Sequence, residues 1–469
     1  MSEQKPAQKK KASSTGKKIK KTAKKEIKKV RKKHPVAFVL AVIAIIALGV
    51  AGYFARQYFF PPEPEMSFVL NGPSSYSVAL ESAYVEKGAK ATYEGKDISN
   101  EIKTVYTCDG VTVPTVDTSK EATFKVTYSI EHEKLVKSLE RSVVVTSITA
   151  DSISIHFLEL GNQYTGDSVY IKAGETDILI DAGSRQSSAG TIGKYLKQPG
   201  LVEDNKLEYV VATHAHQDHI AGFVGTNAAP GIFKQFDVGT IIDFPKTDAT
   251  SSIYNRYVEE RTAEVASGAK HFTALECWNE SKEGAQKSYE IASGITMEIL
   301  YHKYYVESAK GDENNYSVCL LFTQGENHYL FTGDLEAGGE ASLVASNTLP
   351  QVTLFKGAHH GSYTANSDAL LSVIRPEVIC ICCCAGTKEF RPTAGNEFPA
   401  QATVNVMGKY TEKIYVTSLW HEDRADSLNG NIVCTSLGMD LEVHGSNNDT
   451  ILKETDWFKE NRTWPSERR

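Results

Sequence analysis

The feature that most constrains this chain is the stretch Thr213-His214-Ala215-His216-Gln217-Asp218-His219, which directly follows the apolar run Tyr209-Val210-Val211-Ala212. If the apolar run is a strand, the first two histidines after it project to the same side. The Asp-His pair then begins the next element. Two imidazoles suit one divalent ion, and the carboxylate and third imidazole suit a second ion beside it. The alternative is a histidine-rich surface loop, but candidate partners for this cluster lie further along the chain.

Two further motifs flank this stretch. Ile178-Leu179-Ile180-Asp181-Ala182-Gly183 is an apolar run that ends in Asp-x-Gly, and Tyr329-Leu330-Phe331-Thr332-Gly333-Asp334 is one that ends in Gly-Asp. Together with the HxHxDH pattern at 213–219, they occur in the order typical of the metallo-β-lactamase superfamily. The chain therefore resembles that superfamily from about residue 152 to residue 444.

Three other blocks narrow the resemblance. Lys356-Gly357-Ala358-His359-His360-Gly361-Ser362 and Asn314-Asn315-Tyr316-Ser317-Val318 are more specific than the superfamily signature. Leu160-Gly161, followed after a short insertion by Gly166-Asp167-Ser168, fits the opening of the same subgroup. These blocks resemble the lactamase-like domain of the competence protein ComEC and its free-standing relatives.

The resemblance implies two divalent metal ions, with Zn²⁺ favoured and Mn²⁺ as the alternative, bridged by the carboxylate of Asp334. The implied metal ligands are His214, His216, Asp218, His219, Asp334 and one or both of His359 and His360. The implied catalytic residues are Asp218, which would orient the attacking water, and His360. Asp181 would orient the metal-binding imidazoles by hydrogen bonding, without binding the metal itself. Candidates to hold a substrate oxygen are Asn315, Ser317, Lys356 and Ser362, for each of which an ordinary hydrogen-bonded loop residue is the alternative.

The chain departs from the subgroup at one position. Members often carry a His-Pro pair after the His-His-Gly-Ser block, and this sequence has Asn396-Glu397-Phe398-Pro399 there. Glu397 or, from a later loop, His421 could replace the missing ligand. His302 is expected to be a surface residue or a support for the site. A weak second metal site follows from this departure, and a decayed site is the alternative.

The amino-terminal part predicts a membrane anchor. Residues 1–33 form a basic arm with 15 Lys and Arg against 2 acidic residues, although the whole chain has a net charge of -7. Residues 34–56 are apolar from Val36 to Ala55, and about 20 such residues span a bilayer core. A cleavable signal peptide is the rival interpretation, but aromatic residues follow the run. Positive charge fixes the amino terminus in the cytoplasm and places the rest outside the cell. The arm is expected to contact anionic lipid, with sequence-independent nucleic-acid binding as an alternative.

The remaining chain predicts two folded parts. Residues 57–65 form a Pro-rich linker, and residues 66–149 show short alternating strands that resemble a bacterial immunoglobulin-like module. The resemblance implies that residues 150–445 form the hydrolase domain, an α/β fold built as a four-layer αββα sandwich. Apolar runs that alternate with helical stretches near 252–268 and 367–374 support this. Residues 446–469 are expected to be a loose polar tail. The cysteine-rich run at 380–384 occupies a family strand, so its thiols are expected to be buried.

The predicted activity is metal-dependent hydrolysis of a phosphodiester by an extracellular enzyme, because the ComEC-like resemblance implies nuclease or phosphodiesterase chemistry. Candidate substrates are DNA and a phosphodiester polymer of the cell wall; the acidic body offers DNA no long-range attraction. The alternatives are hydrolysis of another ester or a lactam, or a surface scaffold with a decayed metal site. No protein partner is indicated.

Overall fold

The computed structural model describes residues 66–71, 74–80, 84–146, 151–387, 395–420, 428–438 and 440–466. The predicted arm, anchor and linker lie outside these ranges and remain predictions. Within the described ranges, no helix has the length and apolarity needed to cross a membrane.

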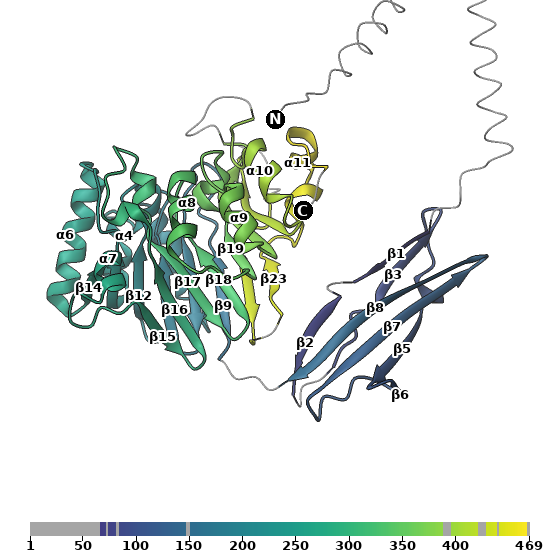
Figure 1. Cartoon of the computed structure of the whole chain (residues 1–469). Coiled ribbons are helices and arrows are strands. Elements are labelled where there is room, and N and C mark those ends of the chain that lie inside the picture. The colour runs from purple at the N-terminus through teal and green to yellow at the C-terminus, as the bar shows by residue number, and fades with distance from the viewer. Residues whose placement is uncertain are drawn as a thin grey trace, which may run out of the picture. The chain divides into compact units, whose positions relative to one another are not determined.

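Residues 66–146 are all-β (Figure 1). The strands are β1 (Met66–Leu70), β2 (Ser75–Ala79), β3 (Ala89–Tyr93), β4 (Lys96–Asp97), β5 (Lys103–Cys108), β6 (Val111–Val113), β7 (Ala122–His132) and β8 (Leu135–Thr146). They form one sheet in the order β1-β3-β4 and another in the order β2-β8-β7-β5-β6. Phe124, Val126, Tyr128 and Ile130 alternate with more exposed residues along β7, so one face of this strand is buried. The immunoglobulin-like character of this region remains a prediction.

Residues 151–466 contain two larger sheets. The first has the order β14-β13-β12-β11-β10-β9-β22-β23 and the second β15-β16-β17-β18-β19-β20-β21. The strands of the first are β9 (Ile153–Phe157), β10 (Val169–Ala173), β11 (Thr176–Ile180), β12 (Lys206–Ala212), β13 (Asp237–Asp243), β14 (Lys270–Thr273), β22 (Ile432–Ser436) and β23 (Glu442–Gly445). The strands of the second are β15 (Ser288–Ala292), β16 (Ile295–Leu300), β17 (Cys319–Gln324), β18 (Asn327–Phe331), β19 (Leu354–Lys356), β20 (Val378–Ala385) and β21 (Ile414–Leu419).

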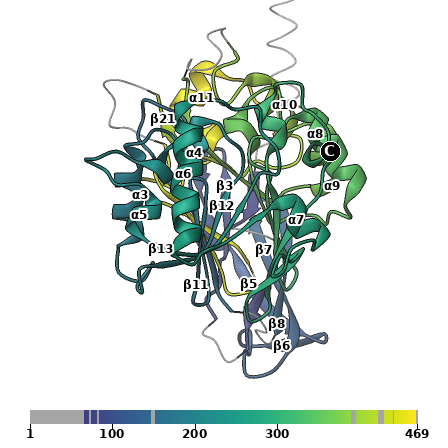
Figure 2. The ribbon, with the colours of Figure 1, turned by 90° about the vertical axis from the view of Figure 1, so that its left-hand side faces the viewer.

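Helices cover the outer faces of both sheets. Figure 2 shows α3, α4, α5 and α6 on one side and α8, α9 and α10 on the other. The helices are α3 (Ser188–Leu196), α4 (Gln217–Val224), α5 (Ile232–Gln235), α6 (Ser252–Ser267), α7 (Ala274–Asn279), α8 (Ala337–Ser346), α9 (Asp368–Ile374), α10 (Gln401–Met407) and α11 (Asp456–Asn461). The predicted α/β sandwich is therefore confirmed, and the predicted helices correspond to α6 and α9.

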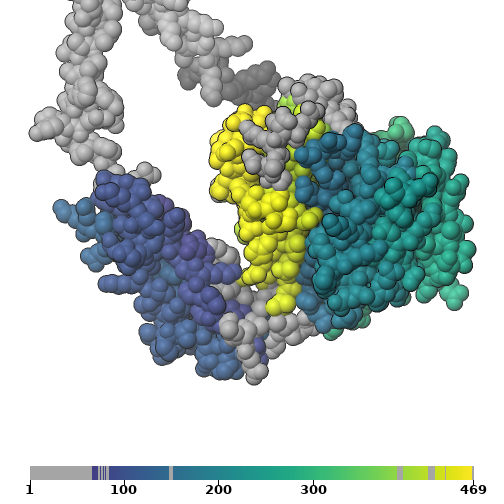
Figure 3. All heavy atoms as spheres, turned by 180° about the vertical axis from the view of Figure 1, so that it is seen from behind, coloured from purple at the N-terminus to yellow at the C-terminus, as the bar shows by residue number. Residues whose placement is uncertain are grey.

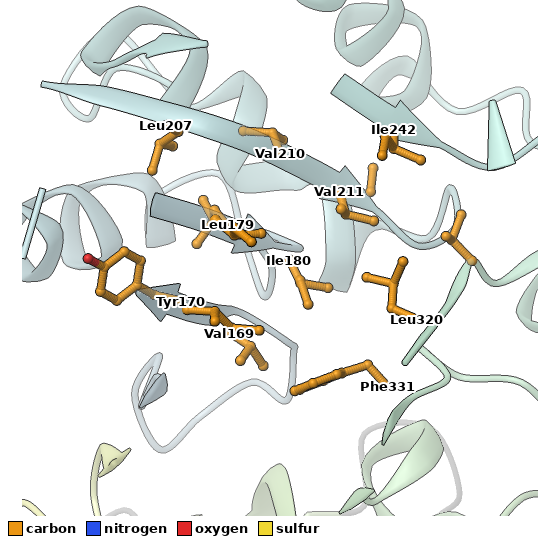
Figure 4. Packing of buried hydrophobic residues seen from close by; sticks show 14 of the residues in the cluster. Val169, Tyr170, Leu179, Ile180, Leu207, Val210, Val211, Ile242, Leu320 and Phe331 are labelled. Carbon is orange, nitrogen blue, oxygen red and sulfur yellow. The ribbon is translucent and has the colours of Figure 1, made fainter. Parts of the chain in front are cut away.

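The main core fills the space between the two sheets. Val210 and Leu179 of the first sheet and Leu320 and Phe331 of the second belong to one buried cluster (Figure 4). The rings of Phe157 and Phe331 stack across the two sheets, with centroids 6.3 Å apart. Strands buried on both faces read as nearly continuous apolar runs, as β20 does with all eight residues buried. The prediction that its cysteines behave as buried apolar residues is confirmed.

The prediction of a loose tail from residue 446 is wrong for the residues that the structure describes. Leu452 and Phe458 are buried in the apolar cluster outside the second sheet, together with residues of α9 and α10. The guanidinium of Arg462 donates to the carbonyl oxygens of Pro399 and Glu397, each at 2.9 Å or less. The segment is mostly polar, but its few apolar residues pack into the core and hold it in place. The carboxyl-terminal residues, yellow in Figure 3, form part of the surface of this body.

The topology brings many strand ends to one edge. β11, β12, β13 and β14 run parallel to one another, and β9 runs in the same direction as β11. In the second sheet, β18, β19, β20 and β21 are likewise parallel. The loops that follow these strands carry the polar motifs of the sequence. Ligand sites in α/β proteins lie beyond the carboxyl ends of parallel strands, so this edge is where a site is expected.

Candidate metal centre

The histidine-rich stretch turns from β12 into α4. The strand ends at Ala212 and the helix begins at Gln217, so Asp218 and His219 lie in its first turn. Asp181, at the end of β11, fixes this turn. Its carboxylate accepts hydrogen bonds from the amide and the hydroxyl of Thr213, both at 2.7 Å, and lies 2.8 Å from Nδ1 of His219. Asp181 therefore orients the imidazole of His219, as a supporting residue of a metal site does.

Asp334 reaches the site from the second sheet, just after β18. The preceding Gly333 has a φ of +54°, and a Cβ atom there would lie 2.8 Å from Oγ of Ser317. Ser317 Oγ also accepts a hydrogen bond from the Asp334 amide at 3.1 Å. Glycine is required at residue 333 because the backbone must take a left-handed conformation against a packed neighbour.

Four side chains converge from these elements. Nε2 of His219 lies 3.1 Å from Oδ2 of Asp334, and Nε2 of His360 lies 3.2 Å from Asp218 and 3.3 Å from Asp334. One ligand atom from each of the four residues lies within 4.8 Å of the other three. Nitrogen and oxygen donors of this kind suit Zn²⁺ or another divalent transition metal.

The charges of the cluster are tightly balanced. Burial alone would lower the pKa of His219 and His360, but the neighbouring carboxylates, Asp334 foremost, raise both pKa values well above the ordinary value. Burial would raise the pKa of Asp334, and the two imidazoles hold it well below its usual range. Burial would also raise the pKa of Asp218, but the hydrogen bond with His360 lowers it to about 2. The carboxylates of the cluster thus favour positive charge beside them, either on these imidazoles or on a bound ion.

The cluster passes one test of fitness for a metal. Oδ1 of Asp334 is buried and has no hydrogen-bond partner among the described residues. Lys356 Nζ lies 3.9 Å from it, beyond hydrogen-bond distance. Buried carboxylate oxygens are normally paired, so the unused acceptor and the convergent imidazoles fit a bound cation.

His214 and His216 form a neighbouring pair. Nε2 of His214 lies 3.0 Å from Nδ1 of His216, and the rings of His214 and His219 are 4.1 Å apart at their centroids. His214 is fully buried, which lowers its pKa well below the ordinary value and keeps its ring neutral, as a metal ligand must be. The two imidazoles can join a first ion, as the sequence predicts, although no third ligand closes around this pair in the described structure.

The structure separates the two adjacent histidines. His360 belongs to the cluster, whereas Nδ1 of His359 lies 3.0 Å from the hydroxyl of Thr364 and 3.5 Å from Glu336. Both residues have positive φ values, of 47° and 54°, so their side chains diverge. Of the two, His360 is the one placed as a ligand and His359 as a wall of the site.

Asp167 is a site residue for which the sequence analysis gave no role. Its Oδ1 lies 3.1 Å from Nδ1 of His360, and its Oδ2 forms an ion pair with Lys356 that is almost completely buried. The carbonyl oxygen of Cys382 lies 3.0 Å from the same Nδ1. Asp167 therefore positions His360 much as Asp181 positions His219. The only signal was its place in the Gly166-Asp167-Ser168 block.

The four predicted oxygen-binding residues have other contacts. Lys356 is buried, where it forms an ion pair with Asp167 and donates a hydrogen bond to the Gly333 carbonyl oxygen. The hydroxyl of Ser317 donates to the Asn314 carbonyl oxygen at 2.7 Å, and Ser362 lies 3.0 Å from the Thr364 hydroxyl. Asn315 donates to Asp312 at 2.6 Å, but its buried Oδ1 accepts no hydrogen bond in the described ranges.

The proposed replacements for the missing ligand differ in outcome. Glu397 accepts from the Gly395 amide at 2.7 Å and faces Arg462, so its carboxylate is engaged outside the cluster. His421 lies outside the described residues. His302 is buried, not on the surface, and Nε2 donates to the Ser317 carbonyl oxygen at 2.8 Å.

The sequence comparisons agree with this geometry. The model of the metallo-β-lactamase superfamily matches residues 161–225, which span the loop of Asp167, the strand before Asp181 and the whole histidine stretch. The chain carries a metallo-β-lactamase-fold domain. Its curated relatives extend the ComEC-like resemblance. They are Recombination protein 2 of Haemophilus influenzae (28% identical), Competence protein ComA of Neisseria gonorrhoeae (26%) and ComE operon protein 3 of Bacillus subtilis (23%).

These alignments are partial. They cover 44–46% of this chain and 21–27% of the relatives, so the chain spans about a quarter of the length of the curated relatives it matches. Solved structures with partial likeness include the lipoprotein BT2262 from Bacteroides thetaiotaomicron (20% identical, 25% of this chain, 54% of that chain, TM-score 0.16). Another is a diphosphatase of the PhnP family (11% identical, 48% of this chain, 85% of that chain, TM-score 0.24).

Proposed function

We propose that this metallo-β-lactamase-fold domain hydrolyses a phosphodiester with the help of one or two divalent ions. The observation that carries the proposal is the convergence of Asp218, His219, Asp334 and His360 from both sheets, with their ligand atoms within 4.8 Å of one another. The favoured ions are Zn²⁺ and Mn²⁺. The names of the curated relatives, which refer to recombination and competence, favour a nucleic-acid substrate over other phosphodiesters.

Asp218 and His360 have different roles in the proposed hydrolysis. A divalent ion in such a site polarises a substrate oxygen and lowers the pKa of water. Asp218 is ionised at neutral pH because of its low pKa, and its side chain is 15% exposed, so it can accept a hydrogen bond from a water molecule and orient it. His360, held through Nδ1 by Asp167 and the Cys382 carbonyl oxygen, presents Nε2 to the cluster, where it would bind the ion. If the ion left Nε2 free, the same imidazole would return a proton to the leaving oxygen.

Other activities remain as alternatives. The same centre suits hydrolysis of another ester or of a lactam, and a phosphodiester polymer of the cell wall is a second candidate substrate. A scaffold with a decayed metal site is the non-enzymatic alternative. The convergence of four donors without a later His-Pro ligand argues against decay, because the described residues form a cluster without it.

We also propose a location for the enzyme from the sequence alone. An apolar segment at 34–56 after a basic arm would anchor the chain in the cell membrane, with the catalytic domain outside. The basic arm would contact anionic lipid on the cytoplasmic side.

The test is hydrolysis of bis-p-nitrophenyl phosphate by the full-length chain, loaded with Zn²⁺ or Mn²⁺, together with measurement of bound metal. Asp218→Ala should lose turnover by at least about 100-fold, the scale of a misplaced reacting group. Asp237→Ala, which removes an exposed carboxylate at the start of β13, is the matched control and should retain it. Bound metal without turnover would point to another ester or a lactam. Neither metal nor turnover would favour the scaffold.

A further inference from the structure

A cavity of about 310 Å³ lies between the loop that follows β9 and the segment that joins β11 to α3. Apart from Leu160 and Gly161, every described residue that lines it has a polar side chain, and none of these residues is acidic. Arg185 contributes the cationic side chain, and Ser184, Ser187 and Thr191 contribute hydroxyl groups. The described lining residues can therefore donate hydrogen bonds to an anion.

The cavity borders the metal centre through shared backbone. Of its lining residues, Tyr164 lies three positions before Asp167 in the chain, and Ser184 directly follows Gly183. The Asp167 amide donates to the carbonyl oxygen of Asp218 at 3.0 Å, and the Gly183 amide donates to that of Asp167 at 2.9 Å. A Cβ atom on Gly183 would collide with the Asp218 carbonyl group. The two loops that line the cavity thus also hold the turn that carries Asp218, so the cavity lies beside that turn.

Tyr164 and Arg185 form a flat surface at this cavity. The guanidinium carbon of Arg185 lies 3.8 Å from the centroid of the Tyr164 ring. The Tyr164 side chain is 44% exposed, which is high for so large a ring. Stacked guanidinium and phenol groups offer a planar face to a base and a cation to a phosphate.

We propose that this cavity, the Arg185 pocket, binds the nucleotide that neighbours the scissile phosphodiester of a single-stranded nucleic acid. The inference rests on the proposed phosphodiesterase function. The net charge of the chain is -7, and the described lining of this pocket carries a cation and no carboxylate, which favours binding of a phosphate there. The planar face selects a nucleic acid over a polyol phosphate polymer, which has no ring to stack.

The test compares two substrates in the full-length, metal-loaded protein. For each variant, kcat/KM for a short oligodeoxythymidylate is divided by kcat/KM for bis-p-nitrophenyl phosphate, which has no neighbouring nucleotide. Tyr164→Ala and Arg185→Gln should each lower this ratio about tenfold, the scale of one stacked base. Tyr164→Phe should keep the ratio, because the ring remains. Lys194→Gln, which removes an exposed cation elsewhere on α3, should also leave it unchanged.

Binding provides a second arm that does not depend on turnover. Fluorescence anisotropy measures the binding of a labelled oligodeoxythymidylate to the Asp218→Ala variant. The double variant Asp218→Ala/Arg185→Gln should bind the same oligomer about tenfold more weakly. A protein that cleaves neither substrate would refute the proposed function, and the binding arm would still decide the pocket. An unchanged ratio in an active enzyme, or unchanged binding in an inactive one, would overturn the inference. The inference would also be overturned if a polyglycerol phosphate bound as tightly as the oligomer and the same variants lost that binding.

Discussion

Lys356 and Asp167 form an ion pair that is almost completely buried at the edge where the two sheets meet, with side chains only 2% and 1% exposed. The lysine comes from the end of β19 in the second sheet, and the aspartate from the loop after β9 in the first. The charge of Asp167 raises the pKa of Lys356 against the opposing effect of burial, so the pair stays ionised. The two sheets are thus linked by charge directly behind the candidate metal ligands.

Lys356→Met should destabilise the protein by about 3–5 kcal/mol, because it leaves the carboxylate of Asp167 buried without its main cationic partner. The double variant Asp167→Asn/Lys356→Met should be more stable than Lys356→Met alone, since it removes the unpaired charge. The measurement is urea-induced unfolding followed by tryptophan fluorescence. Lys206→Met is the control, because its pair with Glu208 is half exposed and should cost at most about 1 kcal/mol. Equal losses at the two lysines would refute the assigned role of burial.

Asp167→Asn should also weaken metal binding by about 10- to 100-fold, the usual effect of removing the residue that orients a ligating imidazole. The amide retains the size of the side chain but loses the charge that faces Nδ1 of His360, 3.1 Å away. Isothermal titration with Zn²⁺ would measure the change. Asp177→Asn replaces another buried carboxylate of the first sheet, which is paired with Tyr170 and Lys172, and should keep the wild-type affinity.

How much of this site the sequence predicts depends on how local each contact is. The turn from β12 into α4 is local, so the spacing of its histidines and aspartate is enough to indicate candidate ligands there. Asp167 gains its role from residues on β19 and η4 (Ala358–Gly361), and no local pattern reveals such a contact. The choice between His359 and His360 depends on two successive positive φ values, which the sequence does not specify.

The same reasoning applies to the fold. Apolar runs and helical periodicity identified β11, β12, β18, α6 and α9, because burial on one or both faces leaves a visible pattern. The carboxyl-terminal segment was misjudged because its few apolar residues, Leu452 and Phe458 among them, lie within a polar stretch. Their burial depends on a surface formed by α9 and α10 elsewhere in the chain.

Gly333→Ala should disrupt the site more than its size suggests. The new methyl group would lie within 3 Å of Ser317 and Thr213, and overpacking of this kind costs about 1–3 kcal/mol in addition to backbone strain. Because Asp334 follows directly, metal binding should fall as well. Gly325→Ala is the matched control: it has a similar φ of +57° at the other end of the same hairpin, and a Cβ atom there meets nothing within 4 Å. Equal effects of the two substitutions on Zn²⁺ affinity would show that strain alone is responsible.

Thiol reactivity should distinguish one cysteine from the other seven. Cys108 is partly exposed and the others are buried. Burial raises the pKa of the Cys382 thiol to about 12, which suppresses the reactive thiolate. Ellman's reagent should therefore modify close to one thiol in the native, reduced protein and eight in guanidinium chloride. Cys108→Ser should abolish the native reaction, and rapid modification of that variant would contradict the burial of the other thiols.

The metal-free protein should have a pH optimum of stability on the acid side of neutrality. The raised pKa values of His219 and His360 provide stability that is complete below about 6.5, the ordinary pKa of histidine, and is lost as the pH rises through their folded-state values. The lowered pKa values of Asp218 and Asp334 provide stability that is present above about 3.9 and lost as the pH falls through their folded-state values. The melting temperature in EDTA should therefore be highest between about pH 4 and 6.5.

Saturating Zn²⁺ should move the pH optimum of stability upward, because binding needs neutral imidazoles and releases their protons. His360→Gln should flatten the decline in EDTA above pH 6.5. A melting temperature in EDTA that keeps rising to pH 9 would show that the imidazoles are neutral in the folded protein.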